Sequence, residues 1–138
     1  SAKTLEFPAR QVASLEALME QADMVVLAVP GGAETRHMIG AAQLAAMRPH
    51  AHLINIARGD VVDEAALIAA LQAGQIAGAG LDVYEHEPAV PEALRRMENV
   101  TLLPHLGTAA LDVREEMGLM ALENAIAHLE GRALPNVV

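Results

Sequence analysis

Residues 53–88, LINIARGDVVDEAALIAALQAGQIAGAGLDVYEHEP, contain the pattern that decides the fold. An apolar strand leads into a turn at Arg58 and Gly59, a helical stretch follows, and a second apolar strand runs into an acidic loop. This order predicts two parallel strands joined by a right-handed helical crossover. Ligands of such sheets bind beyond the carboxyl ends of the strands, so Arg58 and Glu87, which follow the two strands, are candidate site residues.

The same alternation continues on both sides of this stretch. Apolar runs of strand length stand at residues 24–29, 51–56, 76–83 and 100–103. Helices are expected from Ser14, over 34–47 with a break at Gly40, and over 64–73, 91–97 and 109–130. The uninterrupted run at 24–29 is typical of a strand buried on both faces, and residues 1–12 fit a strand remnant or a loop. The chain is therefore expected to be an α/β protein, part of a doubly wound, Rossmann-like parallel sheet in three layers.

Residue types at the ends of two helices support these boundaries. Ser14 and Asp63 are suitable N-caps because their side-chain oxygens can accept a backbone N–H of the first helical turn. Gly74 can end the helix that follows Asp63. The last and longest helix has a face for the core or for an interface, formed at helical spacing by Met117, Met120, Ala121, Asn124 and Leu129.

Composition excludes several classes of function. The net charge of −9 and the single lysine, Lys3, argue against nucleic acid, whose phosphates need clustered basic side chains. The sequence has no cysteine, which excludes disulfides and thiolate metal sites and suits a cytoplasmic protein. No spacing of histidines and acids is typical of a metal site. No metal is therefore expected as a partner. The apolar runs are too short to cross a bilayer, so no membrane partner is expected either.

A glycine-rich dinucleotide-binding turn is not found in these residues. Such a turn, G-x-G-x-x-G, follows the first strand of a doubly wound domain and opens a helix. Gly78 and Gly80 stand inside a strand pattern with no helix after them, so they do not form one. The chain is therefore expected to be the second half of a nucleotide-binding domain.

Three motifs resemble those of the D-isomer-specific 2-hydroxyacid dehydrogenases, in the order in which that family has them. They are NIARGDVVDE at 55–64, GLDVYEHEP at 80–88 and PHLGT at 104–108. The stretches VPGGAETRHMIG, PHLGTA and MGLMALENAIAHLEGRALPNVV are most similar to the glyoxylate/hydroxypyruvate reductase branch.

The resemblance implies an activity and a domain organisation. It implies an oxidoreductase that transfers a hydride between NAD(P)H and a small 2-keto or 2-hydroxy acid, and a homodimer. Residues 1–138 match the C-terminal part of the NAD(P)-binding domain, without its glycine-rich turn and without the substrate domain. These residues alone are therefore expected to be inactive.

The resemblance also assigns roles to individual residues. It implies that His105 is the catalytic acid/base, that Glu87 hydrogen-bonds this histidine, and that Arg58 holds the substrate carboxylate and polarises its carbonyl. Asp82 matches a residue that contacts the nicotinamide carboxamide. The full set of expected contacts to NAD or NADP is Val29, Pro30, Thr35, Ile56, Ala57, Arg58, Asp82, His105, Gly107 and Thr108.

The three catalytic candidates suit this chemistry by residue type. A histidine titrates near neutral pH and can give a proton to a developing alkoxide, and a neighbouring carboxylate favours its charged form. An arginine offers a planar pair of donors to a carboxylate. Taken singly, His105, Glu87 and Arg58 would each pass as a surface or structural residue.

Two further hypotheses stay open: a non-catalytic binding module of the same fold, as in co-repressors of the C-terminal-binding-protein type, and an inactive fragment of the dehydrogenase.

Overall fold

The computed structural model describes residues 9–137 of the chain, which divide after Leu103 into two compact units. Each unit is described by itself. Of the segment 1–12, for which the sequence allows strand or loop, residues 1–8 lie outside the described residues. Residues 9–12 form neither helix nor strand.

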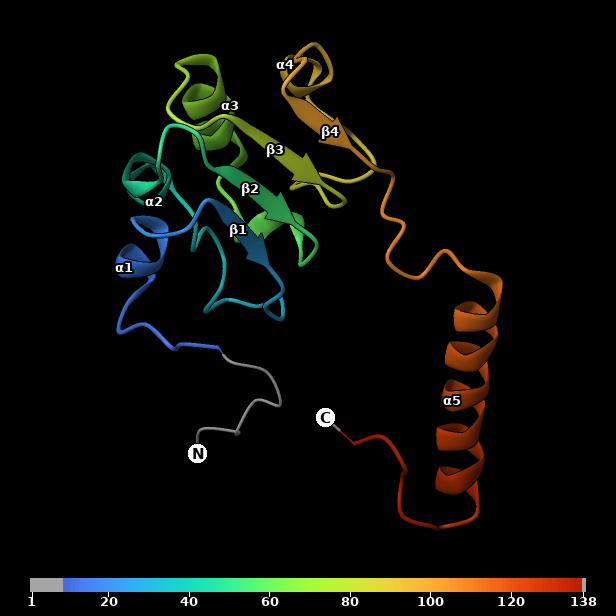
Figure 1. Ribbon diagram of the computed structural model, residues 1–138. Helices are drawn as coiled ribbons and strands as arrows, with labels where there is room; N and C mark the ends of the chain where they lie inside the picture. The colour runs from blue at the N-terminus through green and yellow to red at the C-terminus, as the bar shows by residue number, and fades with distance from the viewer. Residues whose placement is uncertain (1–8, 138) are drawn as a thin grey trace. The chain divides into compact units, whose positions relative to one another are not determined.

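A parallel sheet of four strands forms the centre of the first unit (Figure 1). The strands lie in sequence order and are β1 (Met24–Leu27), β2 (His52–Asn55), β3 (Gly78–Leu81) and β4 (Val100–Leu102). All neighbouring pairs are parallel, with Val25 opposite Leu53 and Leu53 opposite Ala79. The predicted α/β, Rossmann-like parallel fold is confirmed, and each strand lies within the range expected from the sequence.

Helices connect these strands, and two of the helices begin at the predicted caps. The helices of the first unit are α1 (Leu15–Met19), α2 (Ala41–Ala46), the 3₁₀ turn η1 (Gly59–Val61), α3 (Glu64–Gln72) and α4 (Glu92–Arg95). Ser14 Oγ accepts a hydrogen bond from the N–H of Ala17 (3.2 Å), and Asp63 Oδ1 accepts one from the N–H of Ala66 (3.0 Å). Gly74, with φ 65°, follows the C-cap of α3. The predicted starts of α1 and α3 are therefore confirmed.

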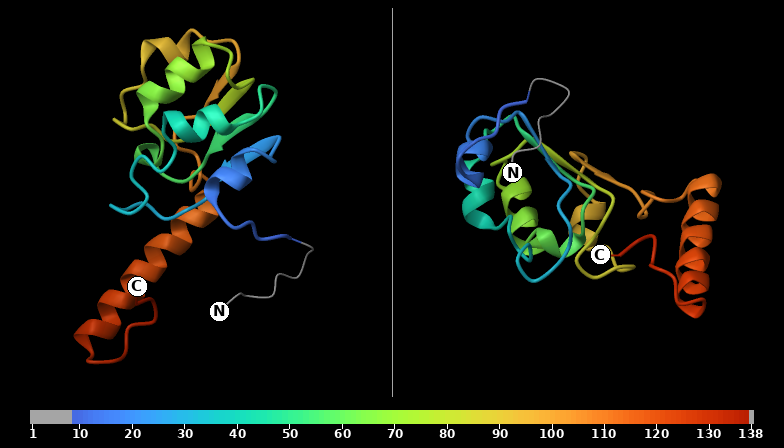
Figure 2. Two further views of the ribbon diagram at one scale, coloured as in Figure 1. Left: turned by 90° about the vertical axis from the view of Figure 1, so that its left-hand side faces the viewer. Right: turned by 90° about the horizontal axis from the view of Figure 1, so that it is seen from below.

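The core of the first unit lies on one face of the sheet. The helices α1, α2 and α3 cover this face (Figure 1 and Figure 2), and Leu44 and Leu67 of these helices pack in one cluster with Leu53 of β2. On the other face, Met24 and Val26 are 63% and 52% exposed. The expectation of burial on both faces is therefore wrong for β1, because no helix within residues 9–103 covers its second face. The third layer that the sequence predicts is not part of these residues.

The segment 34–47 differs from the prediction of two short helices. Only α2, which starts after Gly40, is helical, and residues 33–37 form a turn. His37 has φ 50°, which is outside helical geometry, and its N–H donates to the carbonyl oxygen of Asp60 (2.7 Å). Ile39 then forms a bridge with Val62. This turn keeps one helical bond, from the N–H of Arg36 to the carbonyl oxygen of Gly32 (3.1 Å), and hydrogen bonds to the loop after β2 then take the place of further helical bonds.

The second unit consists of a loop, helix α5 (Leu111–Leu129) and a tail that returns along the helix. The Asn124 side chain joins the two, since it donates to Asn136 Oδ1 (3.0 Å) and accepts from the N–H of Asn136 (3.2 Å). Met117 and Met120 are 51% and 49% exposed, so the apolar face expected for a core or interface is uncovered in the described part of the chain. No helix within residues 9–137 is both long and apolar enough to cross a membrane.

Candidate functional site

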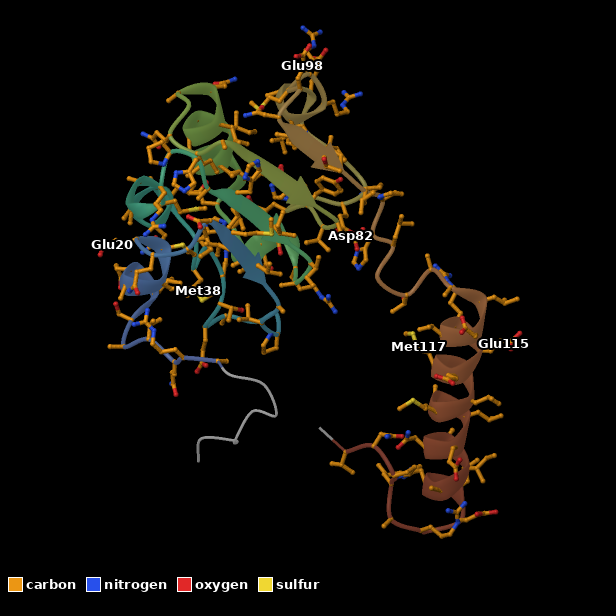
Figure 3. All side chains as sticks on the ribbon, in the orientation of Figure 1. Glu20, Met38, Asp82, Glu98, Glu115 and Met117 are labelled. Carbon is orange, nitrogen blue, oxygen red and sulfur yellow. The ribbon has the colours of Figure 1, made fainter. Side chains whose placement is uncertain are left out.

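The carboxyl ends of the strands carry most of the residues that the sequence singled out. Arg58 follows β2, and Asp82, which is 8% exposed, and Glu87 follow β3. Figure 3 shows Asp82 beyond the arrowhead of β3, whereas Glu98, which precedes β4, lies at the opposite end of the sheet. Because the strands are parallel, the loops after β2 and β3 meet at one edge of the sheet, as ligand-binding loops of this fold class do.

The turn that carries Arg58 is held by Asn55, the last residue of β2. Asn55 is buried, with 1% of its surface exposed. Its amide nitrogen donates to the carbonyl oxygen of Arg58 (3.0 Å), and its amide oxygen accepts from the N–H of Ala57 (3.0 Å). Arg58 itself is exposed, and its Nη1 donates to the carbonyl oxygen of Ala57 (2.7 Å). The backbone of the arginine is therefore fixed to the end of the strand.

Gly59 allows this turn to pack directly on the loop after β3. A Cβ atom at Gly59 would lie 1.9 Å from the carbonyl carbon and oxygen of Tyr84 and 2.4 Å from the nitrogen of Glu85. Gly31, in the loop after β1, leaves room for the stem of Arg58, because a Cβ there would lie 2.8 Å from Cγ of the arginine. The loops after β2 and β3 are thus in backbone contact, and the loop after β1 borders the arginine.

One carboxylate oxygen of Glu87 is fixed within its own loop. Glu87 Oε1 accepts a hydrogen bond from the N–H of Tyr84 (3.0 Å). Tyr84 is buried, and its hydroxyl lies within hydrogen-bond distance of the carbonyl oxygens of Leu103 (2.7 Å) and Leu81 (3.2 Å). Burial raises the pKa of Tyr84, so the hydroxyl remains a donor at neutral pH. The loop that carries the carboxylate is therefore tied to the residue that follows β4.

An ion-pair network that the sequence does not reveal joins the loops after β1, β2 and β3. His37 Nε2 lies 2.8 Å from Oε1 of Glu85, and Arg36 lies 3.5 Å from the same oxygen and 3.9 Å from Asp60. The hydrogen bond from His37 lowers the pKa of Glu85 below its ordinary value. The N–H of Glu85 donates to Glu64 Oε1 (3.1 Å). His37 and Glu85 are 48 positions apart, so no local spacing could have indicated the pair.

Besides Arg58, five of the residues expected to contact a dinucleotide follow β1 and β2. Pro30 is exposed, and its carbonyl oxygen accepts a hydrogen bond from the Thr35 hydroxyl (2.9 Å), which closes the loop after β1. Val29 packs against the core, Ala57 is buried and Ile56 is 55% exposed. The exposed Pro30 and Ile56 offer apolar surface at the carboxyl edge of the sheet, where nucleotides bind in doubly wound folds.

His105, Gly107 and Thr108 belong to the second unit. His105 has φ 56°, in the left-handed region that few residues other than glycine adopt and that is found more often at functional sites. The carbonyl oxygen of Thr108 accepts a hydrogen bond from Nε of Arg114 in α5 (3.2 Å). The structure thus places the arginine and the glutamate of the predicted catalytic trio in one unit and the histidine in the other, and the proximity of all three stays a prediction.

Known proteins match most of this chain. The sequence model described as D-isomer specific 2-hydroxyacid dehydrogenase, NAD binding domain, matches residues 1–107. A glyoxylate reductase of Thermococcus gammatolerans is 52% identical over 124 residues, which are 90% of this chain and 37% of that protein. Glyoxylate/hydroxypyruvate reductase B of Klebsiella pneumoniae is 48% identical over 125 residues, which are 90% of this chain and 39% of that protein. The chain therefore spans less than half the length of these relatives.

Solved structures share the fold at similar identity. An NADPH-dependent glyoxylate/hydroxypyruvate reductase from Sinorhizobium meliloti, in complex with NADP and malonate, has a TM-score of 0.82 and 43% identity and covers 89% of this chain and 40% of its own. A protein from Thermus thermophilus has a TM-score of 0.88 and 43% identity and covers 100% of this chain and 44% of its own. The likeness thus extends over the sheet, its helices and the segment that carries the histidine motif.

Proposed function

Because the chain belongs to the D-isomer specific 2-hydroxyacid dehydrogenase family, within whose NAD-binding domain residues 1–107 fall, we propose that the intact protein is an oxidoreductase of small 2-keto and 2-hydroxy acids. It transfers a hydride between NADH or NADPH and a substrate of the glyoxylate or hydroxypyruvate type. The observation that carries the proposal is the placement of Arg58 and Glu87 beyond the ends of neighbouring parallel strands, on loops in backbone contact. The glyoxylate reductases among the relatives support the substrate class.

Three side chains have distinct tasks in this proposal. Arg58 binds the substrate carboxylate with its planar guanidinium and polarises the adjacent carbonyl. His105 donates the proton that the developing alkoxide requires. Glu87 orients the imidazole, and its own carboxylate is oriented by the hydrogen bond from the N–H of Tyr84 (3.0 Å). His105 follows the last residue of β4, Leu102, by three positions in the sequence, and its motif is the reason to assign it to the same reaction.

The residues present fit part of a nicotinamide dinucleotide. Pro30 and Ile56 expose apolar surface that suits the flat rings of the dinucleotide, and Asp82 would contact the nicotinamide carboxamide. When bound, the nicotinamide supplies or accepts the hydride. The glycine-rich turn that holds a pyrophosphate is not among these residues, so we propose that residues 1–138 alone are inactive. The remaining contacts in this proposal come from Val29, Thr35, Ala57, Arg58, His105, Gly107 and Thr108.

We also propose that the intact protein is a cytoplasmic homodimer. The lack of cysteine suits a reducing compartment. Exposed apolar side chains on α5, such as Met117 and Leu119, offer surface for a second subunit or for further parts of the same protein. Analytical ultracentrifugation tests the assembly, and a monomer at every concentration would contradict it.

The activity is tested with the intact protein that contains these residues. Oxidation of NADH and NADPH is followed with glyoxylate and with hydroxypyruvate, and dinucleotide binding is measured separately by titration. We expect turnover that falls steeply in Arg58→Gln and His105→Ala while dinucleotide binding persists, because the contacts to the dinucleotide that the family resemblance implies for these two residues are made by their backbone. Dinucleotide binding without turnover of any small 2-keto acid would instead indicate the non-catalytic binding module.

The pairing of Glu87 with His105 has a separate test. If the carboxylate interacts with the imidazole, Glu87→Gln should shift the acidic limb of the pH–rate profile. Glu98→Gln is the control, since Glu98 lies at the opposite end of the sheet (Figure 3) and should leave the profile in place. An identical profile in Glu87→Gln and the parent would argue against the pairing.

A further inference from the structure

The side chain of Asn55 is buried at the edge of the proposed site but has no part in the proposed reaction. Only 1% of Asn55 is exposed, and Asn55 and Asp82 are the two buried residues with an amide or carboxylate side chain in the described part of the chain. A buried amide costs free energy unless both its donor and its acceptor have partners. Both partners of this amide belong to the turn that leads to Arg58, so the amide and the turn fix each other.

Asn55 connects this turn to the sheet. Its backbone carbonyl oxygen accepts a hydrogen bond from the N–H of Asp82 (3.0 Å), which fixes the residue against β3. Its side chain then donates to the carbonyl oxygen of Arg58 and accepts from the N–H of Ala57, each at 3.0 Å. The carbonyl oxygen of Arg58 also accepts from the N–H of Val61 (3.2 Å). An amide side chain carries its donor and its acceptor on separate atoms, so it can bond both backbone groups at the same time.

We propose that Asn55 is a positioning residue for Arg58, which sets where the guanidinium meets the carboxylate of the substrate. The proposal rests on the proposed function, because Asn55 acts on substrate only through the arginine. The guanidinium is itself bonded to this turn, because Nη1 of Arg58 donates to the carbonyl oxygen of Ala57 (2.7 Å) and the N–H of Ala57 is held by Asn55. A displaced turn therefore displaces the guanidinium.

Two substitutions in the intact protein test this role. Asn55→Asp keeps the side-chain volume and the acceptor for the N–H of Ala57, but it places a carboxylate against the carbonyl oxygen of Arg58. Asn55→Ala removes both hydrogen bonds. We expect each to raise the KM for glyoxylate by about tenfold or more, because a small displacement of a binding group has effects of this size. In Asn55→Ala, which adds no titratable group, the limbs of the pH–rate profile should not move, because arginine stays protonated throughout.

A double-mutant cycle separates positioning from a general contribution to folding. If Asn55 acts through Arg58, Asn55→Asp should have little further effect on kcat/KM once Arg58→Gln has removed the guanidinium. An equal effect in both backgrounds would overturn the proposal. Asn99→Ala is the matched control: the Asn99 amide also donates to a backbone carbonyl, that of Ala77 (3.0 Å), but it precedes β4 at the opposite end of the sheet. We expect it to leave KM unchanged.

Hydrogen exchange gives a readout that does not need activity. In the intact protein, Asn55→Asp should speed amide exchange in the segment 56–61, where the N–H of Val61 donates to the carbonyl oxygen of Arg58. If the parent has no turnover, the proposed function fails while exchange still tests the link between Asn55 and the turn. Unchanged exchange would overturn the link. Loss of folding in both Asn55 variants, with Arg58→Gln still folded, would assign Asn55 to stability alone and overturn the positioning role.

Discussion

Gly59→Ala should separate the two loops that carry Arg58 and Glu87. The added Cβ atom would lie 1.9 Å from both the carbonyl carbon and the carbonyl oxygen of Tyr84, whereas ordinary contact begins at 3.4 Å, so the loops must move apart by about 1.5 Å. The atoms on both sides belong to the backbone, and they cannot rotate away as the end of a flexible side chain can. We therefore expect the free energy of unfolding to fall by about 3 kcal/mol, the upper end for an overpacked core.

Thermal unfolding of the chain measures this loss. For a chain of 138 residues, about 3 kcal/mol corresponds to a fall in Tm of about 10 °C. In the intact protein, a shift of the arginine by a comparable distance predicts a fall in kcat/KM of about 100-fold. Gly118→Ala, within α5, is the matched control, because no atom lies within 4 Å of its added Cβ and alanine favours a helix. A Gly59→Ala chain that melts within about 2 °C of the parent would refute the backbone contact.

The remaining predictions concern acid unfolding, a buried hydroxyl and an open sheet edge. The hydrogen bond from His37 lowers the pKa of Glu85 from 4.5, so its stabilisation is present above pH 4.5 and is lost as the pH falls through the folded-state pKa. In Glu85→Gln, the urea midpoint should therefore decrease less than in the parent between about pH 6 and about pH 3. An equal decrease in both proteins would contradict the His37–Glu85 interaction. Tyr84→Phe should lower the free energy of unfolding by about 1 kcal/mol, because the carbonyl oxygen of Leu103 loses a donor at 2.7 Å; equal urea midpoints would count against this bond. The chain should self-associate through the edge and the uncovered face of β1, where Val26 is 52% exposed. Light scattering should show an apparent mass that rises with concentration. Val26→Lys should reduce this mass without a change in Tm. A monodisperse monomer of the parent chain at every concentration would rule out self-association.

Local patterns were sufficient to predict the sheet and the places of two catalytic candidates. Apolar runs of strand length alternate with capped helices, and the structure confirms four parallel strands with Arg58 and Glu87 beyond the ends of β2 and β3. The predicted burial of β1 on both faces was wrong. An apolar run indicates that both faces of a strand favour burial, but it does not indicate that the described residues of this chain cover both faces. Val26 is accordingly exposed. The turn at His37 was missed because its N–H bonds to a loop far along the chain.

Three features could be predicted without a structure: the parallel α/β architecture, the N-caps Ser14 and Asp63, and the motifs that place the chain in its family. These features depend on hydrophobic periodicity and on hydrogen bonds between near neighbours in the chain, which can be recognised from the order of residues. The contacts between distant residues are known from the three-dimensional structure alone: Gly59 packs on the backbone of Tyr84, and His37 bonds Glu85, 48 positions along the chain. Such contacts depend on the register and spacing of neighbouring strands, which bring loops distant in the sequence to one edge of the sheet. The spacing of residues within one segment does not specify the distance between two such loops.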